Sequence, residues 1–533
     1  MTPLSSLAPR LLSRPLLLSL FAAVAAGTQG APEVEWFTSH GGTQEESHGH
    51  YILACDDGGY LQVGETGYVG ATARMLVVKT DSSGGLVWKR EFGSGNKNMG
   101  NSALEVDDGY LVCGMLSRNS AILKLDKADG STIFQETHDN GSADAFEHIA
   151  LTQSGILAVG YRLAEDPNST FFAYGRGYIT FLDSSGGFLS GKSVDAHLSQ
   201  AYRVERAGDD FIIAGGTDDA LQYGVIKVDP GGDVLWSRTH GGNDLDHCFG
   251  MDLGPDGSIF LAGHTLSGTA NWDTYTMKLD GSGNKLWERK RGNPRGFNPN
   301  FIHDETWGVR ATCDGGCIIA AGTGDEYAYS ECNAGVCSDQ WEAYVVKFDA
   351  SGSVDWEETY RSSNGQDWAA EDIALSSDGG AVVAVDNAEF GFLKLGPISD
   401  PCGLGESYCS SSPNSVDPFG ALISLTGSAS VSAGDLTLTA GPVPDQPGLF
   451  YFGPDQLLAV FGNGFRCVGG SVYRLPAAFA AGGELSWSID FATPPGGLLA
   501  AGQTWNFQAW YRDPDAGGSG FNLSDGVSLT LLP

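Results

Sequence analysis

Positive charge is scarce in this chain. Lys and Arg number 30 against 65 Asp and Glu, so the formal net charge is 30 − 65 = −35. A field of that sign repels phosphate backbones and anionic lipid headgroups. The composition therefore excludes nucleic-acid binding as a main role, whereas an acidic surface favours solubility and can attract divalent cations.

Long apolar runs are absent beyond the N-terminal segment. The run PLLLSLFAAVAA at 15–26 follows Arg10 and Arg14, and small residues follow it as far as Gly30. This layout is typical of a secretory signal peptide, and the run is too short to span a bilayer. We therefore expect 1–30 to be a leader, the protein to be secreted, and no membrane insertion.

Catalytic signatures are absent as well: there is no nucleophile elbow, phosphate loop, HExxH or EF-hand loop. Glycine, by contrast, is abundant, with 76 residues, and 41% of the chain is hydrophobic. Short apolar runs bounded by Gly and Asp are strand signals. The composition and the Gly and Asp residues between the apolar runs together predict an all-β protein with many tight turns.

A repeat dominates the first 400 residues. VVKTDSSGGLVW (77–88) returns at 225–236, 276–287 and 345–356, with weaker copies at 122–134, 178–190 and 392–398. A hairpin with a DGG-type turn precedes each copy, so each unit reads as four strands. Seven such units predict a seven-bladed β-propeller over residues 31–398.

The last unit stops after three strands, at Leu395, while residues 34–42 (VEWFTSHGG) look like an isolated fourth strand. We predict that this segment pairs with the strand at 391–396 and closes the ring, which would leave no free sheet edge.

A Pro-, Ser- and Cys-rich stretch at 399–415 is the predicted linker, and the short strand-like runs over 416–533 predict a β-sandwich. Ten cysteines in an exported chain favour disulfides. The predicted pairs are Cys332–Cys337 and Cys409–Cys467. Cys313 and Cys317 flank a hairpin turn, where a disulfide or a zinc site remains open. The rings of Trp505, Phe507, Trp510 and Tyr511 could form a sugar-stacking face.

The repeat pattern, with DGG turns followed by VVKxDxxGxxxW, resembles the seven-bladed β-propeller repeats of secreted bacterial proteins. The runs AGQTWNFQAWYRDP (500–513) and FNLSDGVSLTL (521–531) look like a C-terminal module of exported bacterial proteins. The resemblance implies fold and location but no chemistry. Sialidase and quinoprotein repeats are disfavoured, because the spacings Asp81–Trp88 and Asp280–Trp287 do not match theirs. The repeated tryptophans are expected to pack between blades.

Every long insertion falls on one predicted face, at 161–177, 264–274, 291–304 and 323–343. Long loops on a rigid scaffold are where binding and catalysis concentrate. The insertion in the sixth unit is predicted to form a disulfide-stapled lobe over the channel mouth. The candidate ligand-binding residues around it are His303, Asp304, Trp307, Tyr327, Tyr329 and Trp341.

A polar residue begins the first strand of each unit. Five of these residues are carboxylates that could form a cation site, for which calcium is one candidate cofactor, or a pair for acid–base chemistry: Glu46, Asp144, Asp246, Asp304 and Asp367. The alternative is that each residue caps neighbouring backbone amides, as would Asn98 and Ser199. Five histidines share this rim and could bind a metal or transfer protons: His48, His50, His148, His247 and His303.

The leading functional hypothesis is a secreted binding or scaffold protein whose loop face binds an extracellular glycan or protein. The alternative is a polysaccharide-acting lyase or glycosidase on the same face, where Arg295 could assist. A quinone-dependent dehydrogenase is the third hypothesis, disfavoured by repeat spacing.

Overall fold

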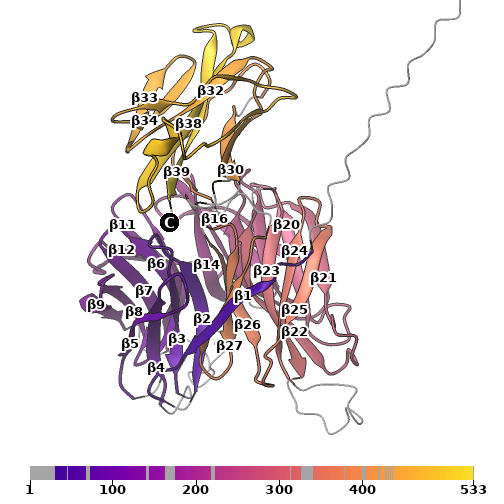
Figure 1. Ribbon diagram of the computed structural model, residues 1–533. Coiled ribbons are helices and arrows are strands. Elements are labelled where there is room, and N and C mark those ends of the chain that lie inside the picture. The colour runs from indigo at the N-terminus through magenta and orange to yellow at the C-terminus, as the bar shows by residue number, and fades with distance from the viewer. Residues whose placement is uncertain are drawn as a thin grey trace, which may run out of the picture.

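The computed structural model describes residues 30–44, 46–67, 72–95, 97–139, 143–162, 175–217, 222–312, 314–325, 340–376, 378–398, 404–417, 420–426, 429, 431, 434 and 436–531. Across these residues the chain forms strands and two short 3-10 helices (Figure 1). The all-β prediction is confirmed. A search of the described helices for one long and apolar enough to cross a membrane finds none. The predicted leader lies outside the described residues.

Within the described ranges, seven antiparallel sheets have four strands each, numbered here by the order of their first strand. The first sheet contains β2 (Ser47–Ala54), β3 (Tyr60–Thr66), β4 (Arg74–Thr80) and β5 (Leu86–Phe92); the second contains β6 (Met99–Val106), β7 (Gly109–Leu116), β8 (Asn119–Leu125) and β9 (Thr132–His138); the third contains β10 (Ala145–Leu151), β11 (Gly155–Arg162), β12 (Arg176–Asp183) and β13 (Phe188–Ser193). The fourth contains β14 (Gln200–Ala207), β15 (Asp210–Gly216), β16 (Tyr223–Val228) and β17 (Val234–His240); the fifth contains β18 (Asp246–Leu253), β19 (Ile259–Thr265), β20 (Asp273–Leu279) and β21 (Lys285–Arg291); the sixth contains β22 (Ile302–Ala311), β23 (Cys317–Asp325), β24 (Glu342–Phe348) and β25 (Val354–Tyr360).

The seventh sheet joins the two ends of the repeat region. It contains β26 (Ala369–Leu375), β27 (Ala381–Asp386) and β28 (Phe390–Leu395), and β1 (Val34–His40) supplies its fourth strand. β1 runs antiparallel to β28, with Val34 opposite Leu395 and His40 opposite Phe390. The predicted pairing is confirmed, and Figure 1 shows the indigo β1 beside the orange strands.

The first strands of the sheets surround a common axis. Each of β2, β6, β10, β14, β18 and β22 contacts the first strand of the following sheet, and β26 contacts β2. Sheets arranged radially in this way form a β-propeller. The turns after first and third strands lie at one end, the turn face. The other connections begin and end at the opposite end, the loop face.

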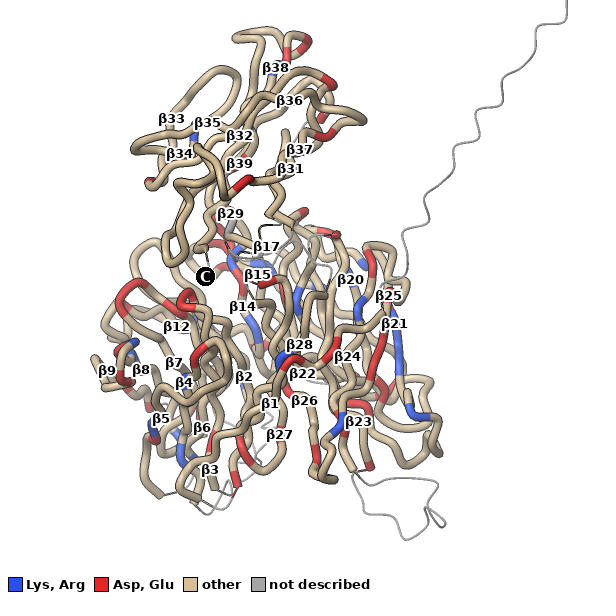
Figure 2. Tube along the Cα trace, viewed as in Figure 1, with Lys and Arg blue, Asp and Glu red and all other residues tan. Residues whose placement is uncertain are grey.

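The repeated lysine of each third strand forms an ion pair with the aspartate of the first turn in the same sheet. Lys79 Nζ lies 2.9 Å from Asp57 Oδ2, and the lysine side chain is 1% exposed. The third sheet lacks both partners, because Phe181 stands at the lysine position and its first turn contains no aspartate. The lysine and the aspartate are missing together, as expected if the ion pair between them stabilises the turn. In Figure 2, Lys and Arg lie mostly along these sheets, whereas Asp and Glu also mark the turns.

The tryptophans repeated in the fourth strands pack on the next sheet, as Trp88 and Trp287 show. The indole of Trp88 donates a hydrogen bond to the carbonyl oxygen of Lys127 at 3.0 Å. It also lies against Gly130, which has φ +69°, and a Cβ there would come within 2.5 Å of the ring. Left-handed backbone and this close approach both require glycine. The same contact joins Trp287 to Gly352.

The C-terminal unit is built from two larger sheets and a hairpin. One sheet contains β29 (Glu406–Ser407), β39 (Phe521–Thr530), β38 (Thr504–Arg512), β32 (Pro447–Gly453), β35 (Tyr473–Arg474) and β36 (Ala478–Phe479); the other contains β30 (Leu422–Thr426), β31 (Thr437–Gly441) and β37 (Leu485–Ser488). β33 (Asp455–Phe461) pairs with β34 (Gly464–Gly469), and the short helices are η3 (Gly496–Leu498) and η4 (Pro514–Ala516). Leu425 and Leu438 of one sheet share a core with Phe450 and Phe507 of the other.

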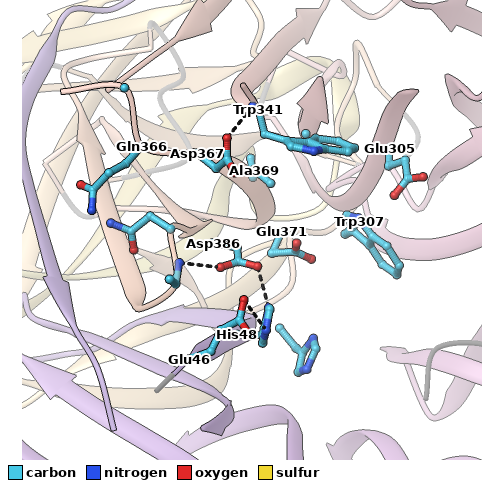
Figure 3. Close-up of a pocket in the computed structure, with 16 residues that line it drawn as sticks. Glu46, His48, Glu305, Trp307, Trp341, Gln366, Asp367, Ala369, Glu371 and Asp386 are labelled. Carbon is cyan, nitrogen blue, oxygen red and sulfur yellow. Dashed lines mark hydrogen bonds and ion pairs between the residues drawn. The ribbon is translucent and has the colours of Figure 1, made fainter. Parts of the chain in front are cut away.

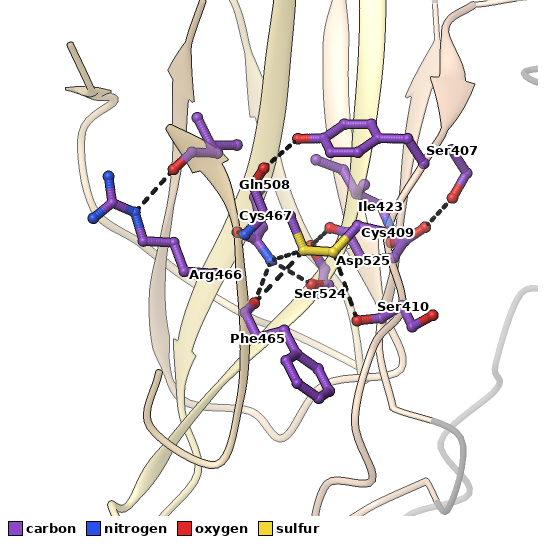
Figure 4. The surroundings of a disulfide bond; sticks show 12 residues. Ser407, Cys409, Ser410, Ile423, Phe465, Arg466, Cys467, Gln508, Ser524 and Asp525 are labelled. Carbon is purple, nitrogen blue, oxygen red and sulfur yellow. Dashed lines mark hydrogen bonds between the residues drawn. A yellow bond between two sulfur atoms is a disulfide. The ribbon is translucent and has the colours of Figure 1, made fainter. Parts of the chain in front are cut away.

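A disulfide joins Cys409 to Cys467, as predicted, with Cα atoms 6.1 Å apart (Figure 4). Gln508 supports it by accepting a hydrogen bond from the Cys467 amide at 2.8 Å. Cys409 and β29, which pairs with β39, both precede residue 416, so residues 406–409 contact the C-terminal unit. Cys317 is a free, buried thiol, which rules out its disulfide with Cys313. Cys313, Cys332 and Cys337 lie outside the described residues.

The C-terminal unit lies beyond the turn face, at the top of Figure 1. Topology dictates this position, because β28 is a third strand and therefore runs from the loop face to the turn face. The chain leaves the propeller there. In both Figure 1 and Figure 2 the loop face, at the bottom, points away from the second unit.

We predict that Asp57→Asn lowers the free energy of unfolding by about 2 kcal/mol, because it leaves the buried Lys79 ammonium without its charged partner. Asparagine can still accept the hydrogen bond from the Gly59 amide that Asp57 accepts at 2.9 Å. Denaturant unfolding checks the value. The double variant with Lys79→Met should recover part of the loss; a double variant less stable than Asp57→Asn would contradict this account.

Candidate functional site

The first strand of every four-stranded sheet contains a β-bulge at the same position. The register shift falls between Gly49 and Tyr51 in the first sheet, for example, and between Ala370 and Asp372 in the seventh. Bulges redirect a side chain. The seven bulged residues are His50, Asn101, Glu147, Tyr202, Phe249, Trp307 and Glu371.

The bulged side chains converge near the axis and divide into two halves. The ring centroids of Tyr202 and Phe249 are 4.8 Å apart, and those of Phe249 and Trp307 are 4.2 Å apart. On the other side, His50 lies close enough to Glu147 and Glu371 to lower the pKa of both carboxyls against the effect of burial. One half of the mouth is therefore aromatic and the other acidic.

A cavity of about 640 Å³ opens where the two halves meet, between the first, sixth and seventh sheets (Figure 3). Three bulged residues line it: His50, Trp307 and Glu371. It lies on the loop face, because it also includes residues 365–367 and 386–388, which connect strands at that end. The cavity is of the size that accepts a small molecule or part of a polymer.

Trp341, a predicted ligand-binding residue, forms one wall of the cavity. Its ring lies over β23, where a Cβ on Gly322 would come within 2.9 Å of the indole and one on Gly324 within 2.4 Å. Its amide donates a hydrogen bond to Asp367 Oδ1 at 2.9 Å. Backbone contacts on one side and bare glycines beneath hold the ring in place before any ligand arrives.

Two carboxyls of the cavity have opposite pKa shifts. Burial raises the pKa of Glu371 to about 8, and the neighbouring Asp386 adds to the rise. Burial also acts to raise the pKa of Glu305, but the hydrogen bond with His303, at 3.2 Å, and the nearby histidines lower it overall. At neutral pH Glu371 is therefore mainly protonated and Glu305 is ionised.

The histidines of the cavity are held as cations by neighbouring carboxylates. His48 Nδ1 lies 2.6 Å from Asp386 Oδ2, and its Nε2 lies 3.6 Å from Glu46 Oε1. Burial acts to lower the pKa of His48, but the hydrogen bond with Asp386 and the charges of Asp386, Glu65 and Glu46 together outweigh it and raise the value to about 9. His50 Nε2 lies 2.5 Å from Glu65 Oε2. Burial also acts to lower the pKa of His50, but the charge and hydrogen bond of Glu65, with the charge of Glu371, together raise it.

The five carboxylates predicted to bind a cation are distributed over five sheets. Asp246 accepts a hydrogen bond from the Gly242 amide at 2.6 Å, and Asp304 accepts one from Asn293 at 2.7 Å. Within the described ranges, no group of three or more His, Cys, Asp or Glu side chains is arranged to hold a metal ion. These contacts match the alternative of amide capping; calcium binding stays a prediction.

The register also corrects the alignment of two of these carboxylates. The amide of Asp304 donates a hydrogen bond to a carbonyl oxygen in the loop between the second and third strands of the preceding sheet, and the amides of Ser47 and Trp368 do the same. We call this the entry position of a sheet; Ser47 occupies it in the first sheet and Trp368 in the seventh. Glu46 and Asp367 each stand one residue earlier. That offset frees both for the cavity, which they line.

The remaining predicted site residues divide between structural and outlying positions. His303 and Asp304 are buried, and burial raises the pKa of Asp304 to about 7. Arg295 donates hydrogen bonds to the carbonyl oxygens of Gln340 and Thr323 and so braces the sixth sheet. Tyr327 and Tyr329 lie outside the described residues, as does most of the predicted lobe.

Other predicted aromatic and histidine positions are also internal. His247 and His264 contact each other through Nδ1 and Nε2 at 3.1 Å, and His148 is buried. In the C-terminal unit Phe507 and Tyr511 belong to the core, so the four rings there do not form one exposed face.

Sequence reasoning missed Glu305, Glu371 and Asp386, although a signal for the bulged residues was present. In every unit the bulged residue stands three positions after the entry residue, as Trp307 does after Asp304 and Glu371 after Trp368. Aligning the units on the entry position would have placed these seven residues at equivalent positions, although not their direction.

No family model matches this chain, and no curated protein matches it. Solved structures with some likeness include the WD40 domain of Neurospora crassa Pan2 (12% identity, 66% of this chain and 90% of that chain, TM-score 0.43) and Kuenenia stuttgartiensis hydrazine synthase (10% identity, 67% and 97%, TM-score 0.44). Sqt1 from Chaetomium thermophilum is another (11% identity, 77% and 97%, TM-score 0.39). Scores this low carry no argument about function.

We predict that Glu371→Gln changes how stability depends on pH. The folded-state pKa of about 8 lies above the ordinary value of 4.5. The stabilising contribution of this carboxyl is therefore complete below about pH 4.5 and is lost as pH rises through 8. Relative to the variant, the native chain should lose about 2–4 kcal/mol of unfolding free energy between pH 5 and about 9. Parallel denaturant curves across this range would contradict the assignment.

Proposed function

We propose that this protein is an exported seven-bladed β-propeller with a C-terminal β-sandwich, and that it binds an extracellular glycan in the cavity on its loop face. The observation that carries the proposal is the pairing of Trp307 and Trp341, two positioned rings, with carboxyl and imidazole groups in one concave site. Export rests on the leader-like N-terminus and on the resemblance to secreted bacterial propeller repeats.

A sugar suits this combination of groups. The C–H face of a pyranose ring is apolar and can lie against an indole, while its hydroxyls need donors and acceptors around the edge. Trp341 is fixed on β23 and supplies such a face. Glu46, Asp367 and Asp386 supply acceptors at the same cavity.

The architecture also favours binding at this face. The C-terminal unit lies beyond the turn face, so the loop face points away from it (Figure 1). A polymer could therefore approach the cavity without displacing the second unit. This arrangement agrees with a binding or scaffold protein that presents one face of a rigid ring.

One observation favours a second candidate, an acid–base enzyme that cleaves the glycan. Glycoside cleavage uses one protonated and one ionised carboxyl on either side of the scissile bond. Glu371 and Glu305 are held in those two states by their surroundings. In such an enzyme Glu371 would donate its proton to the leaving oxygen, and Glu305 would act as the base or nucleophile.

We predict that Trp341→Ala weakens glycan binding about 3–10-fold, the value of one aromatic contact. A glycan array with the secreted chain identifies the ligand, and calorimetry then measures both forms. Trp505→Ala, in the C-terminal unit, is the matched control and should bind as the native chain does. Failure of the folded native chain to bind any glycan, or equal affinity of the Trp341 variant, would overturn the proposal.

We predict for the second candidate that Glu371→Gln reduces cleavage about 100–10,000-fold. Because the acid must be protonated, activity should fall as pH rises through about 8, the pKa of Glu371. Release of reducing ends across pH gives both results. Glycan binding without cleavage at any pH would remove the enzyme candidate and leave the binding protein.

A further inference from the structure

The cavity on the loop face is acidic. Five of its lining residues are carboxylates, and its lining includes no Lys or Arg: Glu46, Glu305, Asp367, Glu371 and Asp386. The two arginines of the nearby channel are engaged elsewhere. Arg310 donates to Asp372 at 3.1 Å, and Arg203 donates to the carbonyl oxygen of Phe249 at 3.0 Å.

Four of the five carboxylates already have a partner. Glu46 and Asp386 contact His48, Asp367 accepts from the Trp341 amide, and Glu305 contacts His303. Glu371 differs, since it has no hydrogen bond or ion pair with any described residue, and burial and neighbouring charges alone account for its pKa. Figure 3 shows it with Asp386, Glu305 and Trp307, which line the same cavity.

The charges facing Glu371 come from three sheets. They are Asp386 on its own sheet, His48 and His50 on the first sheet, and Glu305 on the sixth. Each histidine is matched by a carboxylate, His48 by Asp386 and His50 by Glu65. Among the described residues, the charged groups around Glu371 therefore have an excess of negative charge, and its two cationic neighbours, His48 and His50, are already paired with other carboxylates.

A ligand could supply a cation that pairs with Glu371. An ammonium group beside Glu371 would favour the carboxylate form and make a charge-assisted hydrogen bond. The face of Trp307 would stabilise the same positive charge through a cation–π contact. An aromatic ring next to an unpaired carboxyl is the combination that distinguishes an amine from a hydroxyl.

We propose that the ligand of this cavity is an amino sugar with a free ammonium group, which pairs with the Glu371 carboxylate beside Trp307. The inference rests on the proposed glycan-binding function and names its ligand class. Binding moves one proton: Glu371 releases it to solvent as the ammonium arrives, and no covalent bond changes.

Three β-1,4-linked tetramers that differ in the substituent on carbon 2 test the proposal: tetraglucosamine, its fully N-acetylated form and cellotetraose. At pH 6, where the sugar amines are mainly protonated and Glu371 is neutral in the free site, we expect calorimetry to give tetraglucosamine at least about 10-fold higher affinity than either neutral sugar, as for a hydrogen bond between charged groups. Titrations in two buffers of different ionisation enthalpy should show release of about one proton per tetraglucosamine and none with cellotetraose.

Glu371→Gln should reduce the affinity for tetraglucosamine by about 10-fold or more and so remove its preference over cellotetraose. Glu147→Gln is the matched control, because Glu147 is also a bulged carboxyl near the axis but does not line the cavity. Proton release needs only the native chain, so the test holds even if the Glu371 variant does not fold.

The outcomes separate the two proposals. Equal binding of all three tetramers, or tight tetraglucosamine binding without proton release, would overturn the amino-sugar inference and leave glycan binding intact. Tetralysine binding as tightly as tetraglucosamine would also overturn it, because the site would then select any cation. Binding of none of the sugars would overturn both proposals.

Discussion

The pairing of β1 with β28 is the contact on which the rest of the structure depends. It completes the seventh sheet with a strand from the start of the chain and so places β2 beside β26. His48 and Asp386 are 338 residues apart in sequence, yet Nδ1 and Oδ2 of these side chains lie 2.6 Å apart because the ring closes there. The cavity on the loop face is formed across this closure, between the first, sixth and seventh sheets. Ring closure by β1 therefore brings together the residues of the first and seventh sheets that line the cavity.

The repeat separates what supports the fold from what varies at the site. Ion pairs such as Lys79–Asp57 and packing contacts such as Trp88–Gly130 recur because each sheet must make the same turn and meet the same neighbour. The bulge recurs as well, but its side chain does not: the same backbone irregularity presents histidine, glutamate or an aromatic ring to the axis. The repeated β-bulge thus creates seven positions around the channel opening at which the side chain varies.

Electrostatics at the mouth follow from this variation. The protein is strongly acidic overall, yet His48 and His50 are kept cationic beside carboxylates, and Glu371 is kept mainly neutral because it has no such partner. A neutral, unpaired acid in a cavity with indole walls is costly to ionise until a cation arrives. This is the physical reason why the ligand class can be argued from the site when sequence comparison is silent.

Local sequence determined the strands, their order and the pairing of β1 with β28, because turn residues, strand periodicity and the repeat can all be recognised over short stretches of sequence. It also determined the Cys409–Cys467 pair and the packing role of the repeated tryptophans. Tertiary structure alone decided which polar residues face the cavity. A shift of one residue separates Glu46 from Ser47 and Asp367 from Trp368, and alternation along a strand makes that shift decisive. The bulges that aim Trp307 and Glu371 toward one axis depend on pairing with the neighbouring strand, and a single strand's sequence does not encode that pairing.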